Sequence, residues 1–139
     1  MTSREHEVIG YTPPGKAYFD NAIRYFLGRF NKSIHFIVCT DDFSWTTTNV
    51  VLPTGRTKTS PSAPDVTMTY SRDRTTEVDL AILSMCYHVI MSCGTFGWWA
   101  GWLANGRTIY YKNWPRKSTQ LYEMFKHEDF YPPSWIPLE

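Results

Sequence analysis

Residues 88–111 read HVIMSCGTFGWWAGWLANGRTIYY, and this pattern predicts a strand, a helix and a second strand in succession. The first five residues form a short apolar run, which is typical of a buried strand. Small residues follow, and the aromatic-rich run 96–104 predicts a helix that Asn105-Gly106 ends. The β-branched and aromatic run 108–111 then predicts the next strand.

The same alternation of helices and strands extends through the rest of the chain. Apolar residues at helical spacing predict a helix over 16–30, and the run 34–39 predicts a strand buried on both faces. Thr75 predicts the start of a helix that continues over 78–87. The other expected elements are a helix over 43–49 capped by Asp41 or Asp42, strands at 50–52 and 66–70, a loop over 53–65, a helix over 118–126 and an extended, Pro-rich C-terminus.

Helices that alternate with strands predict an α/β fold, a Rossmann-like parallel sheet with flanking helices. The length of 139 residues fits one domain, which is expected to span residues 1–139. Ligands of such sheets bind at the carboxyl ends of the strands. Two strand ends carry polar residues, the segment 40–42 and the turn 92–95, so the site is expected there.

Composition and charge exclude several classes of protein. With 42% hydrophobic and 17% aromatic residues, the chain has the apolar surface that a disordered chain lacks. A net charge of +1 gives no basic field for nucleic acid. The three cysteines lie in apolar runs without CxxC spacing, so buried thiols are expected rather than a metal site.

Two further segments bear on membranes and secretion. Residues 80–106 contain no Lys, Arg, Asp or Glu and are long enough to span a bilayer. The small and polar residues at 92–95 interrupt this segment, so a buried strand followed by a buried helix is the favoured interpretation. The polar N-terminus is not a signal peptide. Asn31-Lys32-Ser33 is a glycosylation sequon, which has meaning only in the secretory pathway.

The turn formed by Ser92, Gly94, Thr95 and Phe96 is the strongest candidate site of the chain. A helix that begins directly after a strand presents unpaired N–H groups and a positive dipole end, and both favour a bound phosphate. Hydroxyl groups of the turn would add hydrogen bonds. The alternative is an ordinary strand-to-helix turn in which Thr95 caps the helix.

Asp79 is the second candidate, and it also has two interpretations. A carboxylate near the start of a helix is favoured by the helix dipole. Alternatively, Asp79 faces the ligand crevice, where a carboxylate can accept two N–H donors from the edge of a guanine base. His88, in an apolar run, is interpreted as a hydrogen-bonded core residue.

Together these residues resemble the C-terminal, donor-binding part of the galactoside α-1,2-fucosyltransferases, glycosyltransferase family 11. Supporting similarity extends over nearly the whole chain, including the helix at 18–26, the run FIVCTDDFSW at 36–45 and the segments that begin at Leu121 and Phe130. The matching residues of the clearest stretch, 79–113, are Asp79, Ala81, Leu83, Cys86, His88, Ile90, Met91, Gly94, Thr95, Phe96, Gly97 and Trp99.

The resemblance implies a metal-independent, inverting enzyme with a GT-B fold and no cofactor. Such an enzyme transfers fucose from GDP-fucose to the 2-hydroxyl of a terminal galactose on a glycan acceptor. It implies that Asp79 reads the guanine and that the turn 92–96 holds the β-phosphate. For the parent protein it implies a membrane anchor and a place on the lumenal side of the Golgi membrane.

One motif of that family does not match. The family carries His-x-Arg-Arg-x-Asp before this region, and Arg4 and Glu5 do not reproduce it. A leaving diphosphate needs its developing charge stabilised. The chain is therefore expected to be a fragment, a truncated gene product or a degenerate paralogue, and no catalytic base is assigned. The alternative function is a non-catalytic, Rossmann-like nucleotide-binding module.

Overall fold

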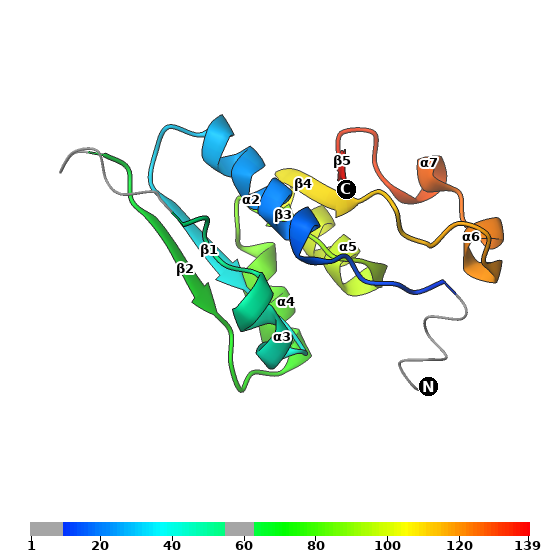
Figure 1. The fold of residues 1–139 in the computed structure, drawn as a ribbon, viewed down its shortest axis with the longest axis horizontal. Helices are drawn as coiled ribbons and strands as arrows, with labels where there is room; N and C mark the ends of the chain where they lie inside the picture. The colour runs from blue at the N-terminus through cyan, green and yellow to red at the C-terminus, as the bar shows by residue number, and fades with distance from the viewer. Residues whose placement is uncertain (1–9, 55–62) are drawn as a thin grey trace.

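The fold is known from a computed structural model, which describes residues 10–54 and 63–139 (Figure 1). The α/β class is confirmed, because parallel strands lie between helices in a Rossmann-like arrangement. The N-terminal residues Arg4 and Glu5 and most of the predicted loop 53–65 lie outside the described residues. The prediction of one domain over 1–139 stays a prediction.

The strands form two small parallel sheets rather than one continuous sheet. In the first sheet Ile34 pairs with Val66, and in the second the strand order is β3-β4-β5. Because all pairs are parallel, the carboxyl ends of the strands in each sheet share one edge. The strands are β1 (Ile34–Val38), β2 (Val66–Tyr70), β3 (His88–Ile90), β4 (Arg107–Tyr111) and β5 (Ile136–Leu138).

One long helix covers one face of both sheets. The predicted helix over 16–30 is confirmed as α2, and its side chains Ala22 and Phe26 pack on Ile109 of β4. Ile23 and Leu27, on the same helix, pack toward β1 and β2. The helices are α2 (Lys16–Arg29), α3 (Phe43–Asn49), α4 (Thr76–Ser84), α5 (Gly94–Ala104), α6 (Gln120–Met124) and α7 (His127–Phe130).

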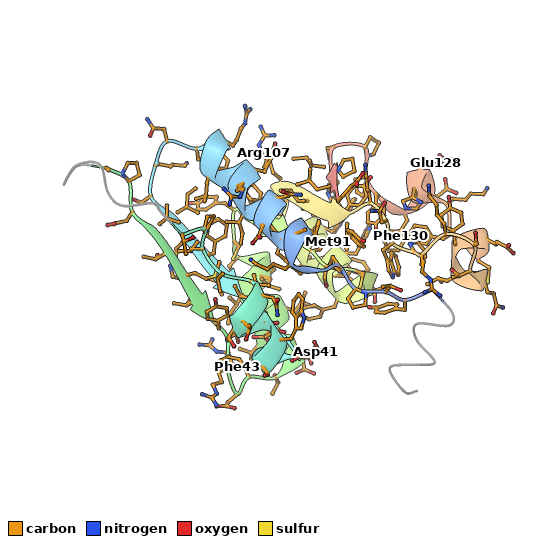
Figure 2. The ribbon with its side chains drawn as sticks, viewed as in Figure 1. Asp41, Phe43, Met91, Arg107, Glu128 and Phe130 are labelled. Atoms are coloured by element: carbon orange, nitrogen blue, oxygen red, sulfur yellow. The ribbon has the colours of Figure 1, made fainter. Side chains whose placement is uncertain are left out.

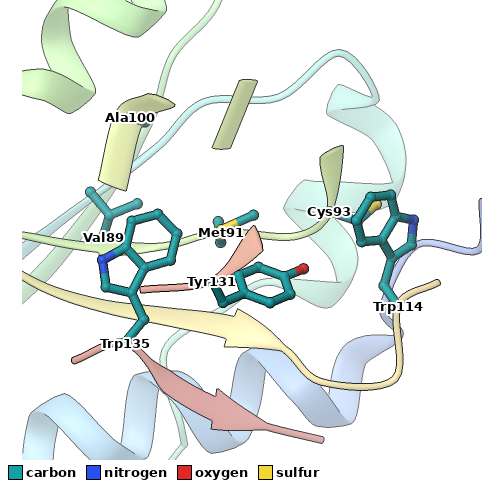
Figure 3. Packing of buried hydrophobic residues seen from close by; sticks show 7 residues of the cluster. All are labelled: Val89, Met91, Cys93, Ala100, Trp114, Tyr131 and Trp135. Carbon is teal, nitrogen blue, oxygen red and sulfur yellow. The ribbon is translucent and has the colours of Figure 1, made fainter. Parts of the chain in front are cut away.

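Helices α4 and α5 pack on the opposite face of the second sheet. Val89 and Met91, in and just after β3, share a hydrophobic cluster with Ala100 of α5. Figure 3 shows this cluster, in which Tyr131 and Trp135 from the C-terminal segment complete the packing. The strands of the second sheet therefore lie between α2 on one side and α5 on the other.

The structure corrects the expectation for strand 34–39. Only one face of β1 is covered, because His35 and Ile37 are exposed. On that outer face the His35 ring contacts Thr67 Oγ1 at 2.6 Å and Thr69 Oγ1 at 3.0 Å. An apolar run such as IHFIV identifies a strand, but it does not reveal whether a helix covers the second face.

Other boundaries also differ from the prediction. Residues 50–52 form no strand, α4 ends at Ser84 rather than at residue 87, and α5 begins at Gly94 rather than at Phe96. Helix α7 was not predicted, whereas the extended C-terminus is confirmed and contains β5. Pro137 lies within β5, and an edge strand tolerates proline because one side of its backbone has no strand partner.

Candidate donor-binding site

The two polar strand ends predicted as site segments lie at the same edge of the molecule. Asp41, after β1, is close enough to Cys93, after β3, to raise the pKa of that thiol. Burial is the larger cause, and it raises the pKa of Cys93 to about 11. Figure 2 shows Asp41 and Met91 toward this edge, whereas Arg107, at the start of β4, lies toward the other. The structure therefore brings the carboxyl ends of β1 and β3 together.

Asp79 lies in the first turn of α4, as the dipole interpretation predicts. Thr75 caps the helix by accepting a hydrogen bond from the backbone N–H of Val78, which confirms its predicted role. The Asp79 carboxylate is partly buried and accepts a hydrogen bond of 2.5 Å from the Ser71 hydroxyl. Ser71 directly follows β2, so Asp79 lies at the carboxyl end of that strand. That Asp79 faces a ligand crevice stays a prediction.

Cys39 lies near Asp79, and sequence reasoning did not assign it. Burial, together with the nearby carboxylate of Asp79, raises the pKa of the Cys39 thiol to about 12. The thiol therefore stays protonated at neutral pH. The Ser71 hydroxyl, at the end of β2, is the group that holds the Asp79 carboxylate by a hydrogen bond.

Residues 91–93 join β3 to α5, so the candidate turn 92–96 includes the first residues of the helix, and its residues differ in exposure. Gly94 is buried with a φ of +81°, a conformation that residues with a side chain rarely adopt. Thr95 is not the helix cap, because the N-cap position belongs to Cys93 and no side chain caps the helix. Ser92 is partly buried, whereas Thr95 and Phe96 are exposed. The Thr95 side chain is thus accessible, and its role in binding a phosphate stays a prediction.

Tyr11 lies against this turn. The two are far apart in the sequence, so no sequence pattern indicates their contact. Its hydroxyl contacts the Cys93 carbonyl oxygen at 3.5 Å, and a side chain on Gly94 would overlap the same hydroxyl. Burial and the neighbouring Cys93 and Asp41 raise the pKa of Tyr11 to about 12, so the phenol is neutral at physiological pH. Tyr11 therefore forms one wall of the predicted phosphate site.

Other predicted residues lie away from this edge. His88 begins β3, where its Nδ1 accepts a hydrogen bond of 3.0 Å from the backbone N–H of Arg107. Its ring stacks on Phe26 and Phe30, and burial is the main cause that lowers its pKa. The interpretation of His88 as a core residue is therefore confirmed. Asn31 is exposed between α2 and β1, and its glycosylation stays a prediction.

The described residues include no candidate metal site and no candidate membrane-spanning helix. Among residues 10–54 and 63–139, no three His, Cys, Asp or Glu side chains gather in a way that would hold a metal ion. The described helices include none that is both long and apolar enough to cross a bilayer.

Comparison with known proteins identifies the family. A family profile described as "Glycosyl transferase family 11" matches residues 6–139. The chain belongs to this family. The resemblance stated from the residues alone is therefore confirmed, and family membership supports a transferase with a Rossmann-like fold. No solved structure matches the chain.

Two curated members of the family show how similar the chain is to its relatives. Galactoside alpha-(1,2)-fucosyltransferase 1 of Homo sapiens is 31% identical over 137 residues, which are 98% of this chain and 34% of the relative. Galactoside alpha-(1,2)-fucosyltransferase 2 of Sus scrofa is 30% identical over 125 residues, 89% of this chain and 34% of the relative. The chain thus spans about a third of the length of these relatives.

Proposed function

We propose that this domain binds the nucleotide of GDP-fucose. We propose further that its parent protein transfers fucose to the 2-hydroxyl of a terminal galactose on a glycan. The observation that carries the proposal is the family match over nearly the whole chain, together with relatives named galactoside alpha-(1,2)-fucosyltransferases. For the parent protein we propose a membrane anchor and the lumenal side of the Golgi membrane, which its family resemblance supports.

The arrangement of Asp79 supports a role in reading the base. A carboxylate held by the Ser71 hydroxyl keeps free lone pairs, which can accept the two N–H donors of a guanine edge. The segment 39–41 lies near both Asp79 and the turn that contains Thr95, because Cys39 is close to Asp79 and Asp41 is close to Cys93. A nucleotide across this edge would place its base at Asp79 and its β-phosphate at the turn.

The first test is the loss of the Asp79 carboxylate. Asp79→Asn removes the charged acceptor of the base contact, and it is expected to weaken GDP binding by about 10- to 100-fold, as loss of a charge-assisted hydrogen-bonded pair does. Calorimetry measures the affinity, and circular dichroism checks the fold. Glu77→Gln, an exposed change of the same charge on the same helix turn, is the control. Equal GDP affinity in Asp79→Asn and in the unchanged protein would refute the role of Asp79.

We also propose that nucleotide binding requires neither a metal nor another cofactor. This expectation rests on the family resemblance. The polar groups at the carboxyl edge of the sheets are hydroxyl, thiol, amide and carboxylate groups from separate segments. The affinity for GDP is expected to be the same in excess EDTA as in Mg²⁺ or Mn²⁺. If a divalent cation proved necessary, the pair Asp41-Asp42 would be the first place to look for its ligands.

A further inference from the structure

An open pocket lies next to the turn 92–96, and sequence reasoning assigned none of its residues. The pocket has a volume of about 590 Å³ and is found where the chain leaves the carboxyl end of β4. In Figure 1 the chain runs from this strand end toward α6 and α7. The pocket residues that carry polar or charged groups include Thr12, Lys112, Arg116, Lys117, Tyr122 and His127.

The lysine and arginine side chains are the charged groups among the described residues that line the pocket. Lys112, Arg116 and Lys117 line it, and none of the described lining residues is acidic. Lys112 forms an ion pair with Glu139 at the C-terminus. Lys117 has no ion-pair partner within the described ranges. An ammonium and a guanidinium on one wall favour an anion, and a guanidinium matches the geometry of phosphate oxygens.

Neutral polar groups in the pocket add hydrogen-bonding capacity. The Thr12 hydroxyl oxygen is buried and has no hydrogen-bond partner among the described residues. The His127 ring contacts the Trp114 carbonyl oxygen through Nε2 at 3.0 Å. A carbonyl only accepts, so Nε2 carries the proton and the ring orientation is fixed.

The pocket and the predicted phosphate turn are neighbours. Tyr11 contacts Cys93 at the turn and packs edge-on against Trp114, with ring centroids 5.7 Å apart. The next residue, Thr12, lines the pocket. The backbone N–H of Arg116 donates to the Gly10 carbonyl oxygen at 3.1 Å, which fixes the segment 10–12 against the loop after β4. The short segment 10–12 thus separates the turn from the cationic side chains of the pocket.

We propose that this pocket is a second phosphate-binding subsite, in which Arg116 and Lys117 contact the oxygen atoms of a phosphate group. The pocket lies at the carboxyl end of a strand, and ligands of parallel sheets bind at such ends. The phosphate belongs either to the nucleotide that lies across the edge or to a free phosphate ion. The assignment of this phosphate to a nucleotide rests on the proposed function. The ability of the pocket to bind a phosphate group does not depend on it.

The test measures pyrophosphate binding to the full chain by calorimetry. Pyrophosphate is expected to bind, and Lys117→Gln and Arg116→Gln are each expected to weaken that binding by about tenfold, the effect of one charge-assisted hydrogen bond. Arg24→Gln, an exposed charge change on α2, is the matched control and is expected to leave the affinity unchanged. Thermal unfolding confirms that each variant is folded.

Competition by GDP identifies the source of the phosphate. If GDP displaces pyrophosphate and Lys117→Gln weakens both, the subsite serves the nucleotide. If pyrophosphate binds through Lys117 while GDP does not bind at all, the pocket is a site for free phosphate. The proposed function, nucleotide binding, is then wrong. The proposal is overturned if pyrophosphate does not bind, or if Lys117→Gln and Arg116→Gln bind it no less tightly than Arg24→Gln does.

Discussion

Replacing Ile109 by alanine is expected to lower the free energy of unfolding by about 2–5 kcal/mol, the usual range for emptying a packed core position. Ile109 is 0% exposed and lies in β4, the central strand of the second sheet. Its side chain packs against Tyr18, Ala22 and Phe26 of α2. The three side chains belong to one helix, so α2 would have to shift as a unit to fill the space. Urea unfolding followed by circular dichroism measures the change.

Two matched variants separate burial from residue type. Ile109→Val removes one methyl group and is expected to cost about 0.5–1.5 kcal/mol. Ile37→Ala makes the same change as Ile109→Ala in β1, where the side chain is 37% exposed, and it is expected to cost about 1 kcal/mol or less. Similar losses for Ile37→Ala and Ile109→Ala would mean that α2 does not pack on β4 as described.

Replacing Gly94 by alanine is expected to have the second largest effect. A φ of +81° costs an L residue about 1–2 kcal/mol, and overpacking typically costs about 1–3 kcal/mol more. The added methyl group would overlap the Tyr11 hydroxyl, so that Tyr11 must move away from the turn. Thermal and urea unfolding measure the loss of stability, and calorimetry with GDP measures the effect on the site.

A double variant separates the two causes. In Tyr11→Phe the hydroxyl is absent, so Gly94→Ala in that background is expected to lose only the conformational part, about 1–2 kcal/mol. Gly28→Ala is the control, because no atom lies within 4 Å of the added carbon and alanine favours a helix. If Gly94→Ala cost the same with Tyr11 and with Phe at position 11, the contact between Tyr11 and the turn would be ruled out.

Local patterns in the sequence were sufficient for most elements of the fold. Apolar spacing located α2, and Thr75 located the start of α4. For α3 the sequence offered Asp41 or Asp42 as the cap, and the structure shows that it is Asp42. Asn105, in the left-handed conformation, ends α5 as predicted. These features depend on contacts between residues a few positions apart, which a sequence displays directly. The division into two sheets depends on distant pairing and was not predictable.

The candidate site was predictable only in part, for a similar physical reason. Asp79 and the turn 92–96 follow from motifs and strand ends, and the structure places both at the carboxyl edge. The contacts of Tyr11 with Gly94 and of Cys39 with Asp79 join segments far apart in the chain. The three cations of the pocket lie close together in the segment 112–117, but nothing in that run indicates that it lines a pocket. Only the folded chain places Thr12 and His127 beside them.

The parallel pairing also determines the order in which the chain can fold. Ile34 pairs with Val66, and Ile109 pairs with Ile136, so every strand pair must close a long loop before it gains any ladder hydrogen bonds. Such topologies fold slowly compared with helical bundles, because the entropy of closure is lost first. Strand β5 follows β4 in the chain, so it leaves the ribosome later than β4 does. During synthesis the edge of β4 that β5 covers is therefore open to other unpaired strands, which favours aggregation over folding until residue 138 emerges.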